Sequence, residues 1–219
     1  VFDTMEIKQK RCIQPRIVSH WKLQAIEQYV LQTAEFVNLY SQWRGTNRFI
    51  ALTIVFDMLA KRPEPAGSGV SLPDLTELRE FIDSGAPLDN NSLKRRIKTT
   101  DSRQLASVLE WSRAVNRDIE RIVTDIPPFP CALDCLWRFR QDSNAVCISQ
   151  TPQETLLREW QRHNVHKFAQ NIMGQEYGTK TEQIKSVAED RYRPRRVLVI
   201  GDSPGDLRAA REYGACFYP

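Results

Sequence analysis

The chain has no apolar run approaching the roughly 18 to 20 residues that a membrane-spanning helix needs, so we expect no membrane span. Its five cysteines are odd in number and form no Cys-x-x-Cys pair, which argues against a disulfide framework or a zinc site. No signal peptide, internal repeat or low-complexity tract is visible. These absences predict a reduced, cytoplasmic protein.

Charge is nearly balanced along the chain. The 31 basic and 27 acidic residues give a net charge of +4, a mild bias that suits an anionic small molecule. The one basic run that stands out lies at residues 94–98, and such runs are usually solvated helix faces. The charge therefore suits an anionic small molecule as partner better than nucleic acid, and no membrane partner is expected.

The first half of the chain is predicted to be helical. From residue 17 to about residue 125, apolar residues recur at intervals of three to five, which is the spacing of one helix face. Strand signals are absent there, and we expect the tryptophans of the chain to pack in the core or between helices. This pattern predicts an all-helical domain.

From residue 126 onward the pattern changes. Apolar runs at residues 145–148, near 172, at 197–200 and at 215–218 alternate with helical stretches at 132–140, 152–163, 180–191 and 204–213. Short apolar strands separated by helices are typical of an α/β fold with a parallel sheet. We therefore predict a Rossmann-like parallel sheet core flanked by helices, with an inserted all-helical cap. Such sheets carry their chemistry at the carboxyl ends of the strands.

Ser149 and Gln150 are predicted on the turn between the first strand and the next helix, where both are candidate substrate contacts. Thr151 and Glu154 have the spacing of a capping box, with Pro152 at the first helical position. A hydroxyl beside the positive end of a helix is suited to an anion. The alternative is a plain strand-to-helix turn in which the polar residues only cap.

Lys180 is predicted in the first turn of the next helix, after a second capping box formed by Thr179 and Glu182. A cation there opposes the helix dipole, which costs about 0.3–1 kcal/mol. That position suggests that Lys180 reaches an anion or a carboxylate. A solvated surface lysine is the alternative.

The most specific signal is the stretch Gly-Asp-Ser-Pro-Gly-Asp at residues 201–206. A buried strand runs directly into it, Ser203 is a good helix N-cap, and Gly214 is suited to the C-terminal cap of the following helix. Asp206 belongs at a helix start on electrostatic grounds alone. Asp202 is different, because together with Asp206 it places two carboxylates where a Mg²⁺ ion could be bound with a substrate phosphate.

These motifs, in this order, resemble those of the haloacid dehalogenase-like hydrolases. Three of that superfamily's four motifs are matched, spread over residues 127–219. The resemblance implies a core at residues 1–13 and 127–219 and a helical cap at 14–126. It also implies that Ser149 binds a phosphoryl group, that Lys180 neutralises it, and that Asp202 and Asp206 hold Mg²⁺ or, for Asp206, the lysine.

The family's first motif, Asp-x-Asp-Gly-Thr, carries an aspartate nucleophile and an aspartate acid–base. This chain opens with Val1-Phe-Asp-Thr. In one alignment Asp3 is the nucleophile, Met5 stands in place of the acid–base, and no strand precedes it. In the other, Val1-Phe-Asp-Thr follows the motif and both catalytic aspartates lie upstream, which is the alignment we favour.

The resemblance therefore predicts a Mg²⁺-dependent hydrolase of a small phosphate monoester, acting through an aspartyl-phosphate. Other reactions of the superfamily are alternatives, namely those of phosphomutases, phosphonate hydrolases and dehalogenases. Dehalogenases usually lack the acid pair that begins at Asp202, which favours a phosphatase. A degenerate family member used for binding or scaffolding is another. Within the cap, Arg44 and Arg48 flank Gly45 and are candidate substrate contacts, although the segment could be an ordinary turn between helices.

Overall fold

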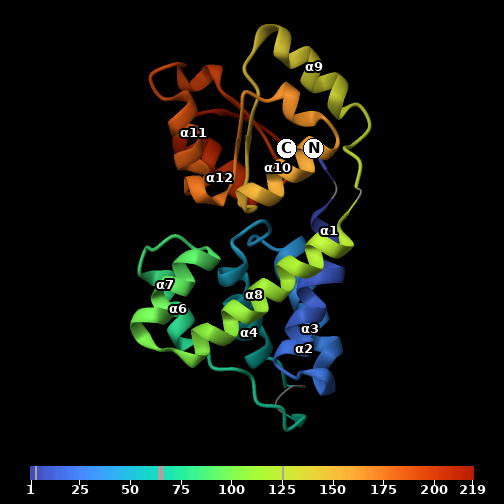
Figure 1. Ribbon diagram of the computed structural model, residues 1–219, viewed down its shortest axis with the longest axis vertical. Coiled ribbons are helices and arrows are strands. Elements are labelled where there is room, and N and C mark those ends of the chain that lie inside the picture. The colour runs from blue at the N-terminus through green and yellow to red at the C-terminus, as the bar shows by residue number, and fades with distance from the viewer. Residues whose placement is uncertain (3, 64–66, 125) are drawn as a thin grey trace. The chain divides into compact units, whose positions relative to one another are not determined.

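The computed structural model describes residues 1–2, 4–63, 67–124 and 126–219. The chain divides into two compact units (Figure 1). The helical unit comprises Thr4–Ile126, and the mixed unit comprises the first residues of the chain with Pro127–Pro219. Residues 4–13, which the resemblance assigns to the core, therefore cluster with the helical unit. Asp3, one candidate nucleophile, lies outside the described residues.

The helical unit contains helices only in its described part. Its elements are α1 (Met5–Lys8), a π-helical turn (Gln9–Ile13), α2 (Gln14–His20), a 3₁₀ turn (Gln24–Ile26), α3 (Glu27–Glu35), a second π-helical turn (Phe36–Tyr40), α4 (Arg48–Ala60), α6 (Thr76–Asp83), α7 (Asn90–Thr100) and α8 (Arg103–Ile122).

Side-chain caps fix where the main helices of this unit begin. The Asn47 side chain accepts a hydrogen bond from Phe49 N at the start of α4. Asp89 caps α7 and Ser102 caps α8 in the same way. Each cap satisfies backbone N–H groups that have no partner within the helix.

A single apolar core holds the helical unit together. At its centre Trp111 of α8 is 1 % exposed, and its ring centroid lies 5.7 Å from that of Trp21. Trp21 also makes an edge contact with Phe56 of α4, at 5.3 Å between centroids. Burial of these rings ties α4 and α8 to the segment that follows α2.

The mixed unit alternates short strands and helices. Its elements are α9 (Ala132–Asp142), β1 (Val146–Ile148), α10 (Gln153–Arg162), a 3₁₀ turn (Val165–Phe168), β2 (Asn171–Met173), a 3₁₀ turn (Gln175–Tyr177), α11 (Lys180–Ala188), a 3₁₀ turn (Pro194–Arg196), β3 (Leu198–Ile200), α12 (Pro204–Tyr213) and β4 (Cys216–Tyr218).

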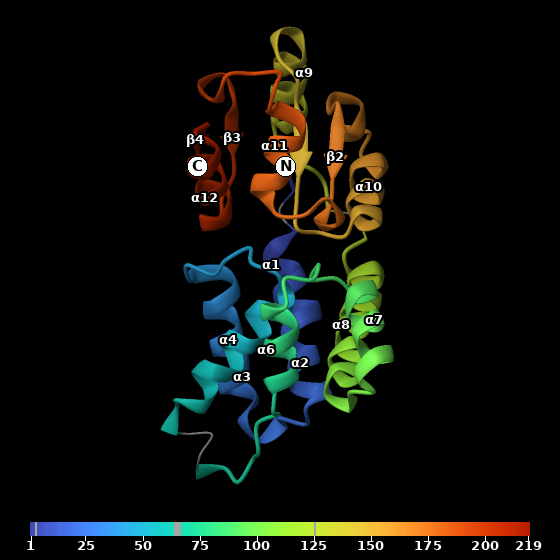
Figure 2. The same cartoon turned by 90° about the vertical axis from the view of Figure 1, so that its left-hand side faces the viewer.

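The strands form two separate parallel pairs, and this corrects the predicted fold. β1 pairs with β2, and β3 pairs with β4, but among the described residues no ladder joins the two pairs. Figure 2 shows β3 and β4 apart from β2, with α11 between them in that view. Each strand has only three residues, so the prediction of an α/β fold with a Rossmann-like sheet core was wrong.

Exposure of the β3–β4 pair gives the physical reason. Val199 is buried against α11 and α12, whereas Leu198 and Ile200 on the other face of the strand are 54 % and 56 % exposed. Tyr218 of β4 is 64 % exposed. The sequence predicts strands covered on both faces, but none of the four described strands is buried on both faces.

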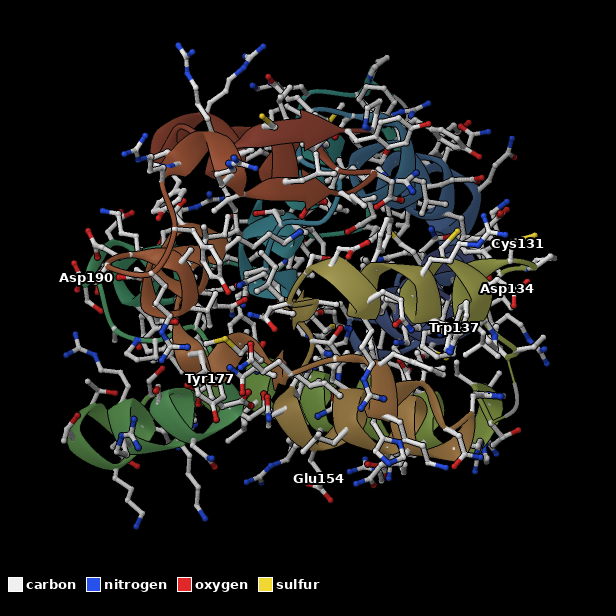
Figure 3. All side chains as sticks on the ribbon, turned by 90° about the horizontal axis from the view of Figure 1, so that it is seen from above. Cys131, Asp134, Trp137, Glu154, Tyr177 and Asp190 are labelled. Atoms are coloured by element: carbon white, nitrogen blue, oxygen red, sulfur yellow. The ribbon has the colours of Figure 1, made fainter. Side chains whose placement is uncertain are left out.

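Two small apolar clusters support the mixed unit. One surrounds Val199 and Ile184, and the other surrounds Trp160 and Val165. The prediction that the tryptophans pack in the core or between helices was wrong for Trp137, which lies on α9 with 57 % of its surface exposed (Figure 3). No helix in the described part of the chain is long and apolar enough to cross a membrane.

Candidate functional site

The candidate site is built around Lys180 at the start of α11. Its Nζ atom lies 2.5 Å from Asp206 Oδ1 and 3.4 Å from Ser203 Oγ, both at the start of α12. The side chains of Lys180 and Asp206 are 16 % and 11 % exposed. The two residues are 26 positions apart in the sequence, so the fold brings together two side chains that the resemblance assigns to one site.

Asp206 is held from three directions. Its Oδ2 accepts hydrogen bonds from Ser203 N at 3.1 Å and from Ser203 Oγ at 2.6 Å, while Oδ1 receives Lys180. The Ser203 hydroxyl caps the backbone N–H of Asp206 in return, which makes a reciprocal capping box. Of the two roles predicted for Asp206, support of the lysine agrees with this geometry. Metal ligation by Asp206 stays a prediction.

Gly201 lets Asp206 sit this close to the end of β3. A Cβ atom on residue 201 would lie 2.6 Å from Asp206 Oδ2, which no ordinary van der Waals contact allows. Residue 201 must therefore be glycine for the Asp206 carboxylate to occupy this position.

Replacing Gly201 with alanine is expected to displace the Asp206 carboxylate, because the added methyl group has no free space. Crowding of this kind costs typically about 1–3 kcal/mol of unfolding free energy, measurable by urea denaturation. Gly205→Ala is the matched control, since its Cβ would meet only Ser203 Oγ at 3.5 Å. Equal unfolding midpoints for the two variants would contradict this account.

The start of α11 is fixed by the predicted capping box of Thr179 and Glu182, which the structure confirms. Hydrogen bonds from Thr179 hold the pKa of the Glu182 carboxyl below its usual value. Gly178 precedes the box at a φ of +88°, where a Cβ would strike the Glu182 carboxylate at 2.5 Å. The helix entry is thus rigid, and it directs Lys180 toward α12.

Ser149 follows β1 and is bonded to the end of β2. Its N–H donates to Met173 O at 3.0 Å, and its hydroxyl accepts from Thr151 N at 3.0 Å. The neighbouring Gln150 reaches the start of α11, where its amide donates to Gly178 O at 3.0 Å. Both predicted phosphate contacts therefore lie beside the loop that leads into Lys180.

The capping box predicted for Thr151 and Glu154 was wrong. α10 begins at Gln153, and its first N–H donates to Glu176 Oε2 at 2.9 Å. Glu154 is exposed and points outward (Figure 3). A carboxylate from the loop after β2 therefore takes the place of the local cap, a long-range contact that spacing cannot reveal.

Gln183 is a site residue that sequence reasoning missed. It lies one turn after Lys180 on α11 and is fully buried. Its Nε2 atom donates to three backbone carbonyls, those of Ser149, Gly174 and Gly178. The only sequence signal was a polar residue next to buried Ile184 on the inner face of the helix, which is too common to single out.

Asp202 provides the exposed carboxylate of the site. It follows Gly201 directly, whereas both oxygens of Asp206 already accept hydrogen bonds. No group of three or more potential metal-ligating side chains was found among the described residues. One exposed carboxylate is nevertheless compatible with Mg²⁺, which often keeps several waters and binds through one or two carboxylates and a substrate phosphate.

Arg44 and Arg48 belong to the helical unit and have partners there. Arg48 is the first residue of α4, and its Nη1 atom donates to Asn116 Oδ1 at 2.7 Å and to Ser112 O at 3.2 Å. Desolvation lowers the pKa of Arg48 to about 10. Arg44 Nη1 donates to Leu39 O at 3.1 Å. Their predicted substrate contacts stay a prediction.

Cys147 of β1 lies next to the site in the sequence, but it is a poor nucleophile. Burial raises the pKa of its thiol to about 12, so the thiolate is scarce at neutral pH. Any nucleophile of this site must therefore come from another group.

Comparisons with protein-family models, with curated proteins and with solved structures found no match. The function of the chain must therefore be argued from its own residues. The residues that carry this argument are Ser149, Lys180, Asp202, Ser203 and Asp206, all from the mixed unit.

Proposed function

We propose that the mixed unit binds a small phosphate monoester together with Mg²⁺ and hydrolyses it. The contact between Lys180 Nζ and Asp206 Oδ1 carries the proposal, because a lysine in the first turn of a helix opposes the helix dipole unless an anion offsets it. Asp206 offsets part of that positive charge. The N-terminal ends of α11 and α12 are also positive, so together with Lys180 they would attract a phosphate.

Each side chain has a role that its position allows. Lys180 neutralises the phosphate, and Ser149 binds it through its hydroxyl group. Asp206 and Ser203 hold the lysine in place. Phosphoryl transfer needs such positioning and charge neutralisation more than it needs covalent chemistry from the protein.

Asp202 is the residue that would hold Mg²⁺. The bound ion supplies positive charge to the phosphate oxygens and to the leaving group. Asp202 carries out this role alone in the proposal, with Asp206 supporting Lys180.

The test is Mg²⁺-dependent hydrolysis of p-nitrophenyl phosphate by the whole chain and by Asp202→Asn. The variant is expected to lose the Mg²⁺-dependent part of the rate, because an amide oxygen binds the ion far more weakly than a carboxylate. Asp190→Asn is the control, since Asp190 is an exposed carboxylate beyond the other end of α11. Equal Mg²⁺ dependence in wild type and Asp202→Asn would remove the role given to Asp202.

A second candidate function is phosphate binding without hydrolysis. It is favoured by the engagement of both Asp206 oxygens, because Asp202 is then the only member of the acid pair that is exposed. The same preparation distinguishes the two functions. Binding of inorganic phosphate in calorimetry without release of p-nitrophenol would support a binding or scaffolding role, whereas release would support hydrolysis.

A further inference from the structure

The Gln183 side chain connects three loops of the mixed unit. Its Nε2 atom lies 2.8 Å from Gly174 O, 3.1 Å from Gly178 O and 3.3 Å from Ser149 O. Gly174 follows β2, Gly178 precedes α11, and Ser149 follows β1. One fully buried amide group therefore fixes the ends of both strands of a pair against the helix that carries Lys180.

The three bonds are not equivalent. Gly174 O also accepts from Tyr177 N, and Gly178 O also accepts from the Gln150 amide. For Ser149 O, Gln183 is the one donor found in the described part of the chain. Loss of the Gln183 amide would thus leave the Ser149 carbonyl unsatisfied while the other two carbonyls keep a partner.

The oxygen atom of the Gln183 amide shows that burying this side chain is energetically unfavourable at one of its atoms. Gln183 Oε1 is buried and has no hydrogen-bond partner among the described residues. An unsatisfied buried polar atom destabilises the fold, and an apolar side chain at this position would place no such atom there. The presence of glutamine at position 183 is therefore better explained by the carbonyls that its Nε2 atom binds than by core packing.

We infer that Gln183 is a positioning residue that sets the Ser149 hydroxyl relative to the Lys180 ammonium group. Lys180 and Gln183 are three residues apart on α11, so one rigid helix carries both the cation and the anchor of the serine. This inference rests on the proposed function, since it assigns Gln183 to the same phosphate site. Gln183 acts through Ser149 and makes no contact with the phosphate itself.

Gln183→Met tests the inference, because methionine keeps the length and helix preference of glutamine and removes the amide. Inorganic phosphate, titrated into the whole chain in calorimetry, is expected to bind about tenfold more weakly to the variant, since small misplacements of binding groups have effects of this size or larger. In a Ser149→Ala background the same change is expected to cost less than about threefold, because the group that Gln183 positions is gone. Additive losses would overturn the inference in favour of a purely structural role.

Amide hydrogen exchange without phosphate provides a readout that does not depend on the proposed function. Gln183→Met is expected to speed exchange at Ser149 and Thr151, whereas Gln161→Met, at an exposed position of α10, is expected to leave both unchanged. In the unaltered protein the side-chain amide hydrogens of Gln183 are expected to exchange more slowly than those of Gln161, a measurement that needs no variant to fold. Equal exchange in these comparisons would overturn the inference. Absence of phosphate binding by the unaltered protein would overturn the proposed function alone.

Discussion

Replacing Lys180 with methionine is expected to weaken phosphate binding by the whole chain about 100-fold, because a charge-assisted hydrogen bond to the phosphate is lost. The change also leaves the Asp206 carboxylate without the cation that lies 2.5 Å away. An uncompensated carboxylate at 11 % exposure would repel the phosphate further. Calorimetric titration with inorganic phosphate in the presence of Mg²⁺ measures the loss.

The control for this change is Lys185→Met on the same helix. Lys185 is exposed, and the two variants carry the same net charge. A general electrostatic attraction of phosphate to the chain would weaken equally in both, whereas a specific site loses binding only in Lys180→Met. Equal affinities for the two variants, with circular dichroism spectra like that of the unaltered protein, would remove Lys180 from the site.

Local sequence signals predicted the elements of the mixed unit well. The helix predicted at residues 204–213 is α12 (Pro204–Tyr213), which Ser203 caps at its start and Gly214 ends at a φ of +83°. The helix predicted at 180–191 is shorter and ends at Ala188, where Glu189 leaves the helical region. The caps of α11 and α12 depend on neighbours within a few residues, so the sequence contains them, whereas the start of α10 depends on Glu176 and could not be read locally.

The assembly of the strands could not be predicted in the same way. The apolar pattern of residues 197–200 is compatible with a strand buried on one face or on both, and only pairing partners distant in the sequence decide between them. Leu198 and Ile200 turned out to lie on an exposed face. Periodicity gives the presence of a strand, but it does not say how many strands join into one sheet.

In the candidate site, too, some residues could be predicted from local sequence signals and others could not. Lys180 stood out because it opposes the helix dipole, and Asp202 and Asp206 stood out by their spacing in a recognisable motif. Gln183 had no such signal, since its importance depends on three carbonyls from other elements. Residues that recognise backbone atoms of distant segments leave little trace in the sequence.

Truncation of Trp111 to alanine in the helical unit is expected to have the largest effect on stability. Trp111 is 1 % exposed and contacts Trp21 at the centre of the core, so its removal leaves a large cavity. Truncation of a buried tryptophan costs about 3–5 kcal/mol of unfolding free energy. Urea denaturation followed by far-ultraviolet circular dichroism measures the loss, because the helical unit contains α8 and α4, the two longest helices in the described part of the chain.

Trp111→Phe is the matched control for that truncation. Phenylalanine keeps an aromatic ring in the core and removes the indole Nε1 atom, which is buried without a partner in the described part of the chain. Removing an unsatisfied N–H group stabilises the protein and offsets part of the free energy lost with the smaller contact area. We therefore expect the unfolding free energy to fall by less than about 1.5 kcal/mol. If phenylalanine were as destabilising as alanine, the Nε1 atom would be making a hydrogen bond that stabilises the unit. If both changes were nearly neutral, the core of the helical unit would not depend on the packing around Trp111.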